Sequence, residues 1–307
     1  MSKPLVIYHG NCADGFTAAW CFHKKYGDTY EYFAGTYQTP PPDVTGRDVY
    51  LVDFSYKRPV VEKMLSVANS VTLIDHHKSA IEDLDGLKDH YDNYYLYISL
   101  VKSGARLAWE WCFGSFPAPY VLKHVEARDL WKFLPATREV TAVVFSYEYT
   151  FENWDALMSV AEDRAGISFN SLDDGYSIGD MISEGQAVER KHHKDVAELN
   201  KALTFRMNIG GHNVPVVNVP YTYGSDACNK LCEGEPFAAY FYFKPTGVEF
   251  GLRSSEKGLD VSAIAVLYSG GGHRNASGFR VSFEKFNEMF TATGDGGLPI
   301  PMMNVGQ

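Results

Sequence analysis

Acidic and imidazole side chains stand directly after three short apolar runs in the first quarter of the chain. Each run leads into residues that can bind a metal ion or transfer a proton: His9 after 5–8, Asp53 after 49–52, and Asp75, His76 and His77 after 71–74. Short apolar runs of this kind are typical of buried strands, and ligand sites of open α/β sheets form at the carboxyl ends of the strands. The pattern therefore predicts one site built from distant parts of the chain.

Two further acidic residues belong to the same candidate site, Asp14 at the start of a helical pattern and Asp129 in the helical stretch 125–131. Carboxylates and neutral imidazoles suit Mn²⁺, Mg²⁺, Fe²⁺ or Zn²⁺. Several carboxylates that meet without a cation repel one another and are costly to bury. Two divalent ions remove that cost, and such a pair can clamp a phosphate for in-line attack by bound water.

Taken one at a time, these residues also have ordinary explanations. Asp14 could simply cap a helix, His9 could be a hydrogen-bonded histidine of the core, and Asp129 could pair with a neighbouring basic residue on the surface. The doublet His76-His77 is harder to explain in this way. It favours a shared site for the whole group.

Strand-like and helical patterns alternate through the first part of the chain. The strand-like runs 5–8, 30–33, 49–53 and 71–75 alternate with helical patterns at 14–26 and 59–68. Gly27 suits a helix C-cap, and Pro59 suits a first helical turn. The alternation predicts an α/β fold with a doubly wound, mainly parallel sheet, followed by amphipathic helices up to about residue 151.

The composition changes near residue 201, where strand-like runs and short helices resume and predict a second, smaller α/β domain. The expected strands are 202–207, 214–219, 238–243 and 248–252, with helices near 225–233 and 260–268. We expect a first domain at 1–183, a connecting helix at 184–200, the second domain at 201–291 and a loose tail at 292–307. The histidine doublet at 192–193 favours a solvated helix over a metal site, because adjacent residues point to different helix faces.

Four segments, in order along the chain, carry a resemblance to a known family. Residues 8–15 (YHGNCADG), 52–54 (VDF), 74–77 (IDHH) and 128–131 (RDLW) resemble the motifs of the DHH phosphoesterase superfamily. That superfamily includes single-strand-specific exonucleases, nanoRNases, cyclic-dinucleotide phosphodiesterases and a class of inorganic pyro- and polyphosphatases. The resemblance implies a nanoRNase-like hydrolase whose first domain is the catalytic DHH domain.

The resemblance also implies a role for each motif residue. A dinuclear site, with Mn²⁺ favoured and Mg²⁺ or another divalent ion as the alternative, would be bound by five residues: His9, Asp14, Asp53, His76 and Asp129. Asp53 would bridge the two ions, Asp75 would orient a histidine from behind the ligands, and His77 would face the scissile phosphate as a charge stabiliser or proton donor. A structural hydrogen bond is the alternative role for His77.

Cys12 departs from the family pattern, since many members have an aspartate at this position, two residues before Asp14. A thiolate could bind the first ion, with its pKa lowered by the metal, or the side chain could only pack. The sequence favours no strong ligation, and the substitution leaves the identity of the first ion open. A cysteine at this position could also make the enzyme sensitive to oxidation.

The segment 269–279, SGGGHRNASGF, is the most distinctive one of the second domain. Consecutive glycines let backbone N–H groups approach an anion, although a glycine-rich turn alone is usually only a turn. The segment resembles the GGGH motif of the DHHA1 domain that follows many DHH domains, and 251–255 resembles its other substrate-facing element. By that resemblance four residues would hold the substrate: Arg253, Gly271, Gly272 and His273. A surface salt bridge is the alternative role for Arg253.

The composition is that of an ordinary globular protein with a formal net charge of −10. This charge disfavours binding to long duplex DNA, which needs a basic face, but it does not exclude a small anionic substrate. No apolar stretch approaches the ~20 residues of a membrane span, and the N-terminus leads straight into a strand, so we expect neither membrane contact nor a signal peptide. Five cysteines without framework spacing favour a reducing compartment, the cytoplasm, with Cys228 and Cys232 as packing residues.

The motif residues, together with the family resemblance, imply a metal-dependent phosphodiesterase, a nuclease-like hydrolase in which two ions activate water. The expected substrates are short oligonucleotides or linear or cyclic dinucleotides, cleaved to nucleoside monophosphates. The alternatives are a phosphomonoesterase or polyphosphatase that acts on a smaller anion, and a non-catalytic nucleotide sensor. The tyrosines at 91–97 could stack on bases or pack in the core, and assembly into a homo-oligomer stays open.

Overall fold

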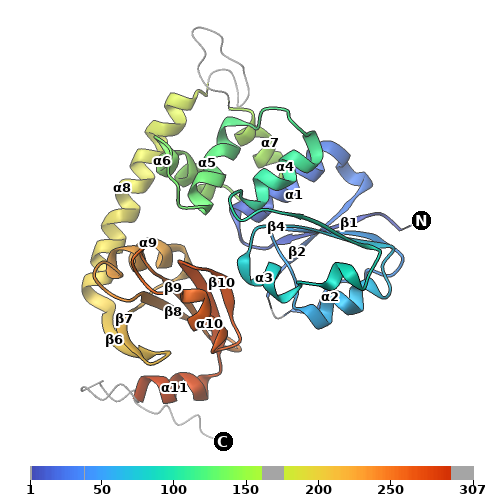
Figure 1. The fold of residues 1–307 in the computed structure, drawn as a ribbon. Coiled ribbons are helices and arrows are strands. Elements are labelled where there is room, and N and C mark those ends of the chain that lie inside the picture. Colours follow the sequence, from blue (N-terminus) through green and yellow to red (C-terminus); the bar gives the residue numbers. More distant parts are fainter. Residues whose placement is uncertain (1, 38, 161–175, 292–307) are drawn as a thin grey trace, which may run out of the picture. The chain divides into compact units, whose positions relative to one another are not determined.

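The computed structural model describes residues 2–37, 39–160 and 176–291, which fold into two compact units (Figure 1). The first unit runs to Lys191 and the second begins at His192, within the long helix α8 (Ile178–Leu203). Both units are α/β, as predicted. The predicted boundaries at 183 and 200 fall inside α8 and stay predictions, and the predicted tail at 292–307 lies outside the described residues.

The sheet of the first unit consists of parallel strands in the order β2-β1-β3-β4-β5. Their bounds are β1 (Leu5–His9), β2 (Glu31–Gly35), β3 (Asp48–Val52), β4 (Ser70–Asp75) and β5 (Tyr94–Ile98). The chain adds β2 on one side of β1 and then crosses to add β3 on the other, so the winding reverses between β1 and β3. Doubly wound sheets bind ligands at such a switch point, outside the carboxyl ends of the strands. His9 and Asp53 lie there.

Helices cover both faces of this sheet, because successive side chains of a strand point to opposite faces. One core joins Val6, Val52 and Ile74 of the sheet to helices of the upper face in Figure 1. These helices are α1 (Ala13–Tyr26), α4 (Gly104–Phe113), α5 (Tyr120–Asp129), α6 (Thr137–Ser146) and α7 (Phe151–Met158). The opposite core joins Ile7 and Leu51 to α2 (Arg58–Leu65), beside which lies the short α3 (Lys78–Asp83).

Local sequence signals account for several helix ends of the first unit. Gly27 terminates α1 with a φ of 55°, and Pro59 lies in the first turn of α2, both as predicted. At the start of α1, a methyl group on Gly15 would come within 2.6 Å of the His9 Cβ. Glycine at this position therefore lets the helix begin directly against the end of β1, which keeps His9 and Asp14 close together.

Strand β5 was not predicted, and it lies at the edge of the parallel sheet. Its residues Tyr94 to Ile98 are apolar or aromatic throughout, so the sequence shows no alternation that would mark a half-buried strand. Tyr94 is fully buried in the core on the α2 face, whereas Tyr95 is half exposed. For Tyr94, the core-packing interpretation is therefore the correct one.

The second unit is built on a mixed sheet in the order β10-β11-β9-β8-β7-β6, in which only the β7–β8 pair is parallel. Its strands are β6 (Thr204–Ile209), β7 (His212–Asn218), β8 (Ala238–Lys244), β9 (Gly247–Arg253), β10 (Gly271–His273) and β11 (Ala276–Val281). Its helices after α8 are α9 (Tyr221–Leu231), α10 (Val261–Val266) and α11 (Phe283–Thr291). Cys228 and Cys232 are buried in the core between α9 and the sheet, as predicted.

No helix among the residues that the structure describes has both the length and the apolar character that crossing a membrane requires.

Candidate metal centre

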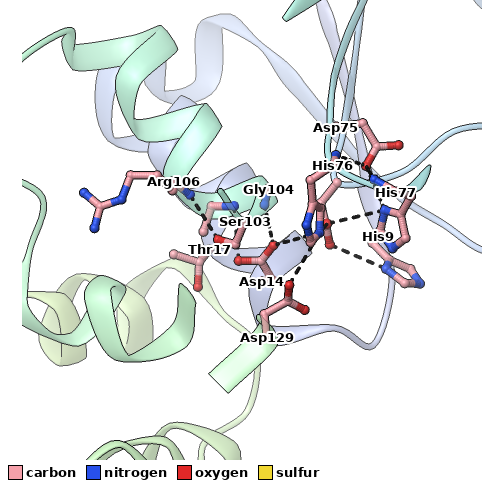
Figure 2. A network of polar contacts seen from close by, with 12 residues as sticks. His9, Asp14, Thr17, Asp75, His76, His77, Ser103, Gly104, Arg106 and Asp129 are labelled. Carbon is pink, nitrogen blue, oxygen red and sulfur yellow. Dashed lines mark hydrogen bonds and ion pairs between the residues drawn. The ribbon is translucent and has the colours of Figure 1, made fainter. Parts of the chain in front are cut away.

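The carboxyl edge of the parallel sheet brings together the motif residues of the first unit (Figure 2). They come from the ends of three strands and from two helices: His9 from β1, Cys12 and Asp14 from the start of α1, Asp53 from the end of β3, Asp75, His76 and His77 from the end of β4, and Asp129 from the last residue of α5. Parallel strands end at the same edge, so residues up to 120 positions apart meet in one cluster.

Asp53 occupies the centre of this cluster, and its two carboxylate oxygens face different partners. Oδ1 lies 3.0 Å from His76 Nε2, and Oδ2 lies 3.5 Å from His9 Nδ1. The Asp53 backbone has a φ of 53° directly after the last residue of β3. A left-handed conformation costs a non-glycine residue of order 1 kcal/mol or more, and such costs gather at functional sites.

Two groups of three donor residues lie within the cluster, and a further group consists of Asp53, Asp75, His76 and His77. His9, Cys12 and Asp53 form one group, and Asp14, His76 and Asp129 form the other; within each group, one donor atom per residue lies within 4.8 Å of the other two. The contact between Asp53 and His76 joins the two groups. In Figure 2, Asp14 and Asp129 approach the His76 ring from one side, with His9 and His77 on the other.

Asp14 does not cap its own helix, which was the ordinary explanation for this residue. Its carboxylate instead accepts hydrogen bonds from the backbone N–H groups of Gly104 (2.6 Å) and Ala105 (3.2 Å), in the first turn of α4. A helix N-terminus stabilises a negative charge, so α4 anchors the carboxylate within the cluster. A methyl group on Gly104 would come within 2.7 Å of Asp53 Oδ1, which explains the need for glycine there.

Asp75 is fully buried, and its carboxylate holds His76 and His77 in place through hydrogen bonds. Its Oδ1 accepts hydrogen bonds from the backbone N–H groups of His76 (2.7 Å) and His77 (3.2 Å) and lies 2.7 Å from His77 Nδ1. The ring that Asp75 touches is therefore that of His77, whereas the His76 ring rests on Asp53. Both rings are fixed before any ligand arrives.

Burial and crowding of like charges determine the electrostatics of the cluster. Burial, reinforced by the charges of Asp53 and Asp129, raises the pKa of Asp14 well above its usual value. The loss of solvent around the Asp129 carboxylate within the cluster also raises its pKa, although Asp129 as a residue is exposed. Burial alone would raise the pKa of Asp53, but the adjacent rings of His76 and His9 hold it well below the usual range. Burial would lower the pKa of His76, yet Asp53 raises it to about 10. The cluster thus contains more acid than its imidazoles can balance.

The residues present fit a site for divalent metal ions. His9 Nδ1 and Asp53 Oδ2 are buried, and neither makes a hydrogen bond within the described residues. Buried polar atoms normally have partners, and two such atoms that converge are suited to a shared cation. Carboxylate oxygen and imidazole nitrogen donors match Mn²⁺, Fe²⁺, Zn²⁺ and, with fewer imidazoles, Mg²⁺.

Two aromatic residues and a glycine of this site were given no role from the sequence. Tyr37, which is half exposed, lies edge-on to the His9 ring with 5.3 Å between ring centroids, and Phe54 lies 5.1 Å from Tyr37. Phe54 follows Asp53 directly, which is the one local signal for it. Tyr37 and Gly104 carry no such signal, because they reach the site only through the fold.

The four predicted substrate-binding residues of the second unit lie in one sheet. Arg253 of β9 pairs with Ala276 of β11, and Ala276 pairs in turn with His273 of the edge strand β10. Arg253 and His273 therefore occupy one row across the sheet, roughly 10 Å apart, with both side chains on the same face. Gly271 and Gly272 belong to β10, so the predicted glycine-rich turn is a short strand.

The contacts of Arg253 differ from a surface salt bridge. Its guanidinium donates to Ser225 Oγ at 2.7 Å and lies 5.9 Å from the centre of the Tyr240 ring, and it forms no ion pair within the described part of the chain. Gly272 has a φ of 139°, and a methyl group there would come within 2.6 Å of the Ala276 carbonyl oxygen. This backbone geometry is restricted to glycine.

Comparison with known proteins supports the fold assignment. No family model matches the chain. An uncharacterized protein of Acanthamoeba polyphaga mimivirus is 28% identical over 320 aligned positions, which cover 96% of this chain and 71% of the relative. Among solved structures, the DHH domain of a protein described as a member of a family of ribosomal proteins superposes with a TM-score of 0.56 at 12% identity, covering 94% of this chain and 84% of that one. The chain therefore has the DHH fold that its motifs predicted.

A pGpG-specific phosphodiesterase from Vibrio cholerae is also similar, with a TM-score of 0.47, 16% identity and coverage of 95% of this chain and 97% of that one. A superposition this loose supports no conclusion about the activity of the present chain.

Proposed function

We propose that the protein is a metal-dependent phosphodiesterase that cleaves short oligonucleotides or linear or cyclic dinucleotides to nucleoside monophosphates. The DHH fold and the motif residues support the assignment to phosphoesterases. The observation that carries the proposal is the position of Asp53, a buried carboxylate whose two oxygens face two different donor groups. A carboxylate placed in this way is suited to bridge two cations.

Each cation would have its own set of protein ligands. His9 and Asp53, with Cys12 beside them, would hold one ion, and Asp14, His76, Asp129 and the second Asp53 oxygen would hold the other. When bound, the ions supply a nucleophilic water at neutral pH and offset charge on the phosphate oxygens. The α4 N-terminus keeps Asp14 in place during turnover, because its backbone N–H groups already hold that carboxylate.

His77 would act on the substrate itself. Asp75 fixes the His77 ring through Nδ1 at 2.7 Å, so the rest of the ring has one defined direction. A histidine held in this manner can donate a hydrogen bond or a proton to a phosphate oxygen as charge develops there.

In the second unit, the row formed by Arg253 and His273 would bind a phosphate or the terminal nucleotide. Arginine suits this role because its planar fork matches a phosphate. The formal net charge of −10 favours short substrates over long ones, because a long nucleic-acid strand would be repelled along an acidic protein surface.

Hydrolysis assays with Mn²⁺ on a linear dinucleotide, a cyclic dinucleotide and tripolyphosphate test this proposal. We expect turnover of one or both dinucleotides to nucleoside monophosphates, with little turnover of tripolyphosphate. Consumption of tripolyphosphate alone would replace the proposed substrate with a smaller anion. Dinucleotide binding without turnover under any divalent ion would indicate a nucleotide sensor.

A further inference from the structure

Cys12 differs from every other cysteine in its surroundings. Cys21, Cys112, Cys228 and Cys232 are each at most 4% exposed and lie in hydrophobic cores, whereas Cys12 is partly exposed beside the carboxylate cluster. Packing therefore accounts for the other four and does not account for Cys12.

The backbone places the Cys12 thiol at the cluster without giving it a role in the helix. Cys12 is the N-cap residue of α1, with an extended backbone at φ −122° and ψ 130°, and its side chain makes no capping hydrogen bond. Serine, threonine, aspartate or asparagine is the usual choice at an N-cap, because their oxygens accept a helix N–H. A cysteine at this position gives up that stabilisation.

A second observation points to a ligand in the same place. The Cys12 sulfur lies within 4.8 Å of donor atoms of both His9 and Asp53. Asp53 Oδ2, on a side chain that is 1% exposed, has no hydrogen-bond partner within the described residues, and neither does the buried His9 Nδ1. A nitrogen, an oxygen and a sulfur thus lie within 4.8 Å of one another.

We propose that Cys12 binds one of the two cations as a thiolate and makes that position selective for Fe²⁺, Co²⁺ or Zn²⁺ over Mg²⁺ and Mn²⁺. This inference rests on the proposed metal-dependent function and deepens it. Thiolates favour softer ions, whereas carboxylates and water suit Mg²⁺ and Mn²⁺. On binding, the sulfur–hydrogen bond is replaced by a sulfur–metal bond, and the proton leaves to solvent.

The two ion positions then differ in chemistry. The group of His9, Cys12 and Asp53 offers nitrogen, sulfur and oxygen, whereas Asp14, His76 and Asp129 offer one nitrogen and two carboxylates. We expect the first position to retain a borderline ion while the second exchanges Mn²⁺ or Mg²⁺. The pair would be a mixed one under conditions in which both kinds of ion are present.

Cobalt spectroscopy tests the proposal independently of activity. Metal-free full-length protein is titrated with Co²⁺, and the near-ultraviolet absorption that a thiolate–Co²⁺ bond produces is recorded beside the bound cobalt content. We expect the band in the wild type and its loss in Cys12→Ser and Cys12→Asp, with cobalt still bound in Cys12→Asp. Cys232→Ala is the matched control and should keep the band.

Selectivity is measured by dialysis of each protein against equal Zn²⁺ and Mn²⁺, followed by metal analysis. Cys12→Asp should lower the bound Zn²⁺-to-Mn²⁺ ratio by about 10-fold or more relative to wild type. An unchanged ratio, or cobalt bound by wild type without the thiolate band, overturns the role of Cys12 and leaves the proposed function standing. Failure of the wild type to bind Co²⁺ at all overturns both.

Discussion

In the first unit Asp14, Asp53, Asp75 and His76 are each at most 2% exposed, whereas Arg253 and His273 of the second unit stand partly exposed on an antiparallel ladder. The buried residues gather from β3, β4 and α1 and are locked by short contacts to one another. The exposed residues are held by strand register, with a hydroxyl and an aromatic ring as neighbours of Arg253.

This difference suits the two sets of residues to different roles in the proposed function. A buried acidic cluster is costly unless it holds a cation, so its residues are suited to chemistry at fixed geometry. A partly exposed arginine and histidine in one row remain solvated, so they destabilise the fold little when no ligand is bound. They are suited to binding a mobile anion. Substitutions in the first unit should therefore lower kcat, and those in the second should raise KM.

The largest effect is expected for Asp53→Asn, which keeps the shape of the side chain and removes its charge. Because Asp53 touches both donor groups, kcat for a dinucleotide should fall by about 10³-fold or more. Steady-state kinetics with Mn²⁺ and circular dichroism measure activity and folding. Asp92→Asn, an exposed aspartate of the same unit, is the control. Full activity in Asp53→Asn would refute the bridging role.

Asp75→Asn should lower kcat by about 10- to 100-fold, because residues behind a metal site typically contribute that much. The substitution removes the charge that orients His77 and leaves the two donor groups intact. Kinetics together with metal analysis provide the test, with bound metal expected to match the wild type. Loss of metal in parallel with activity would instead make Asp75 a ligand.

Arg253→Ala should raise KM by about 10- to 100-fold, since a hydrogen bond to a charged group contributes about 1.5–3 kcal/mol. The value of kcat should stay within about 3-fold, because Arg253 is proposed to bind substrate and does not belong to the cluster. Arg206→Ala, on the edge strand β6 where Arg206 pairs with Glu235, provides the control. A fall in kcat at constant KM would contradict the division between the two units.

The smallest effect is expected for Gly104→Ala. The added methyl group overlaps the Asp53 side chain, and overpacking of this kind typically costs about 1–3 kcal/mol of the free energy of unfolding. Urea denaturation measures this cost. In Gly179→Ala, the new methyl group would make only an ordinary contact at 3.5 Å, and we expect a change within about 0.5 kcal/mol. Equal stabilities of the two variants would show that α4 can move away from Asp53.

Much of the fold could be predicted because the local signals agree with it. The runs that became β1, β3 and β4 are short, apolar and bounded by polar residues, and Gly27 and Pro59 have backbone preferences that mark helix ends. Strand β5 was not predicted, because its apolar residues show no alternation. Helix α8 is longer than the charged run from which it was predicted.

The candidate site, too, could be predicted only in part. The DHH motifs identified the residues that meet in the cluster, but not which oxygen faces which ring. That Asp14 is held by the α4 N-terminus, and that Asp75 touches the His77 ring and not the His76 ring, depends on contacts across the chain. Tyr37 reached the site with no signal in its own segment.

The sequence by itself indicated which segments form strands and helices and which acidic and imidazole side chains belong to the site. These are local properties of the chain. The tertiary structure decided which atoms face one another at the switch point between β1 and β3, and that Cys12 joins His9 and Asp53 while Asp14 joins His76 and Asp129. Those pairings depend on how helices pack against a twisted sheet, a long-range outcome that no short segment encodes.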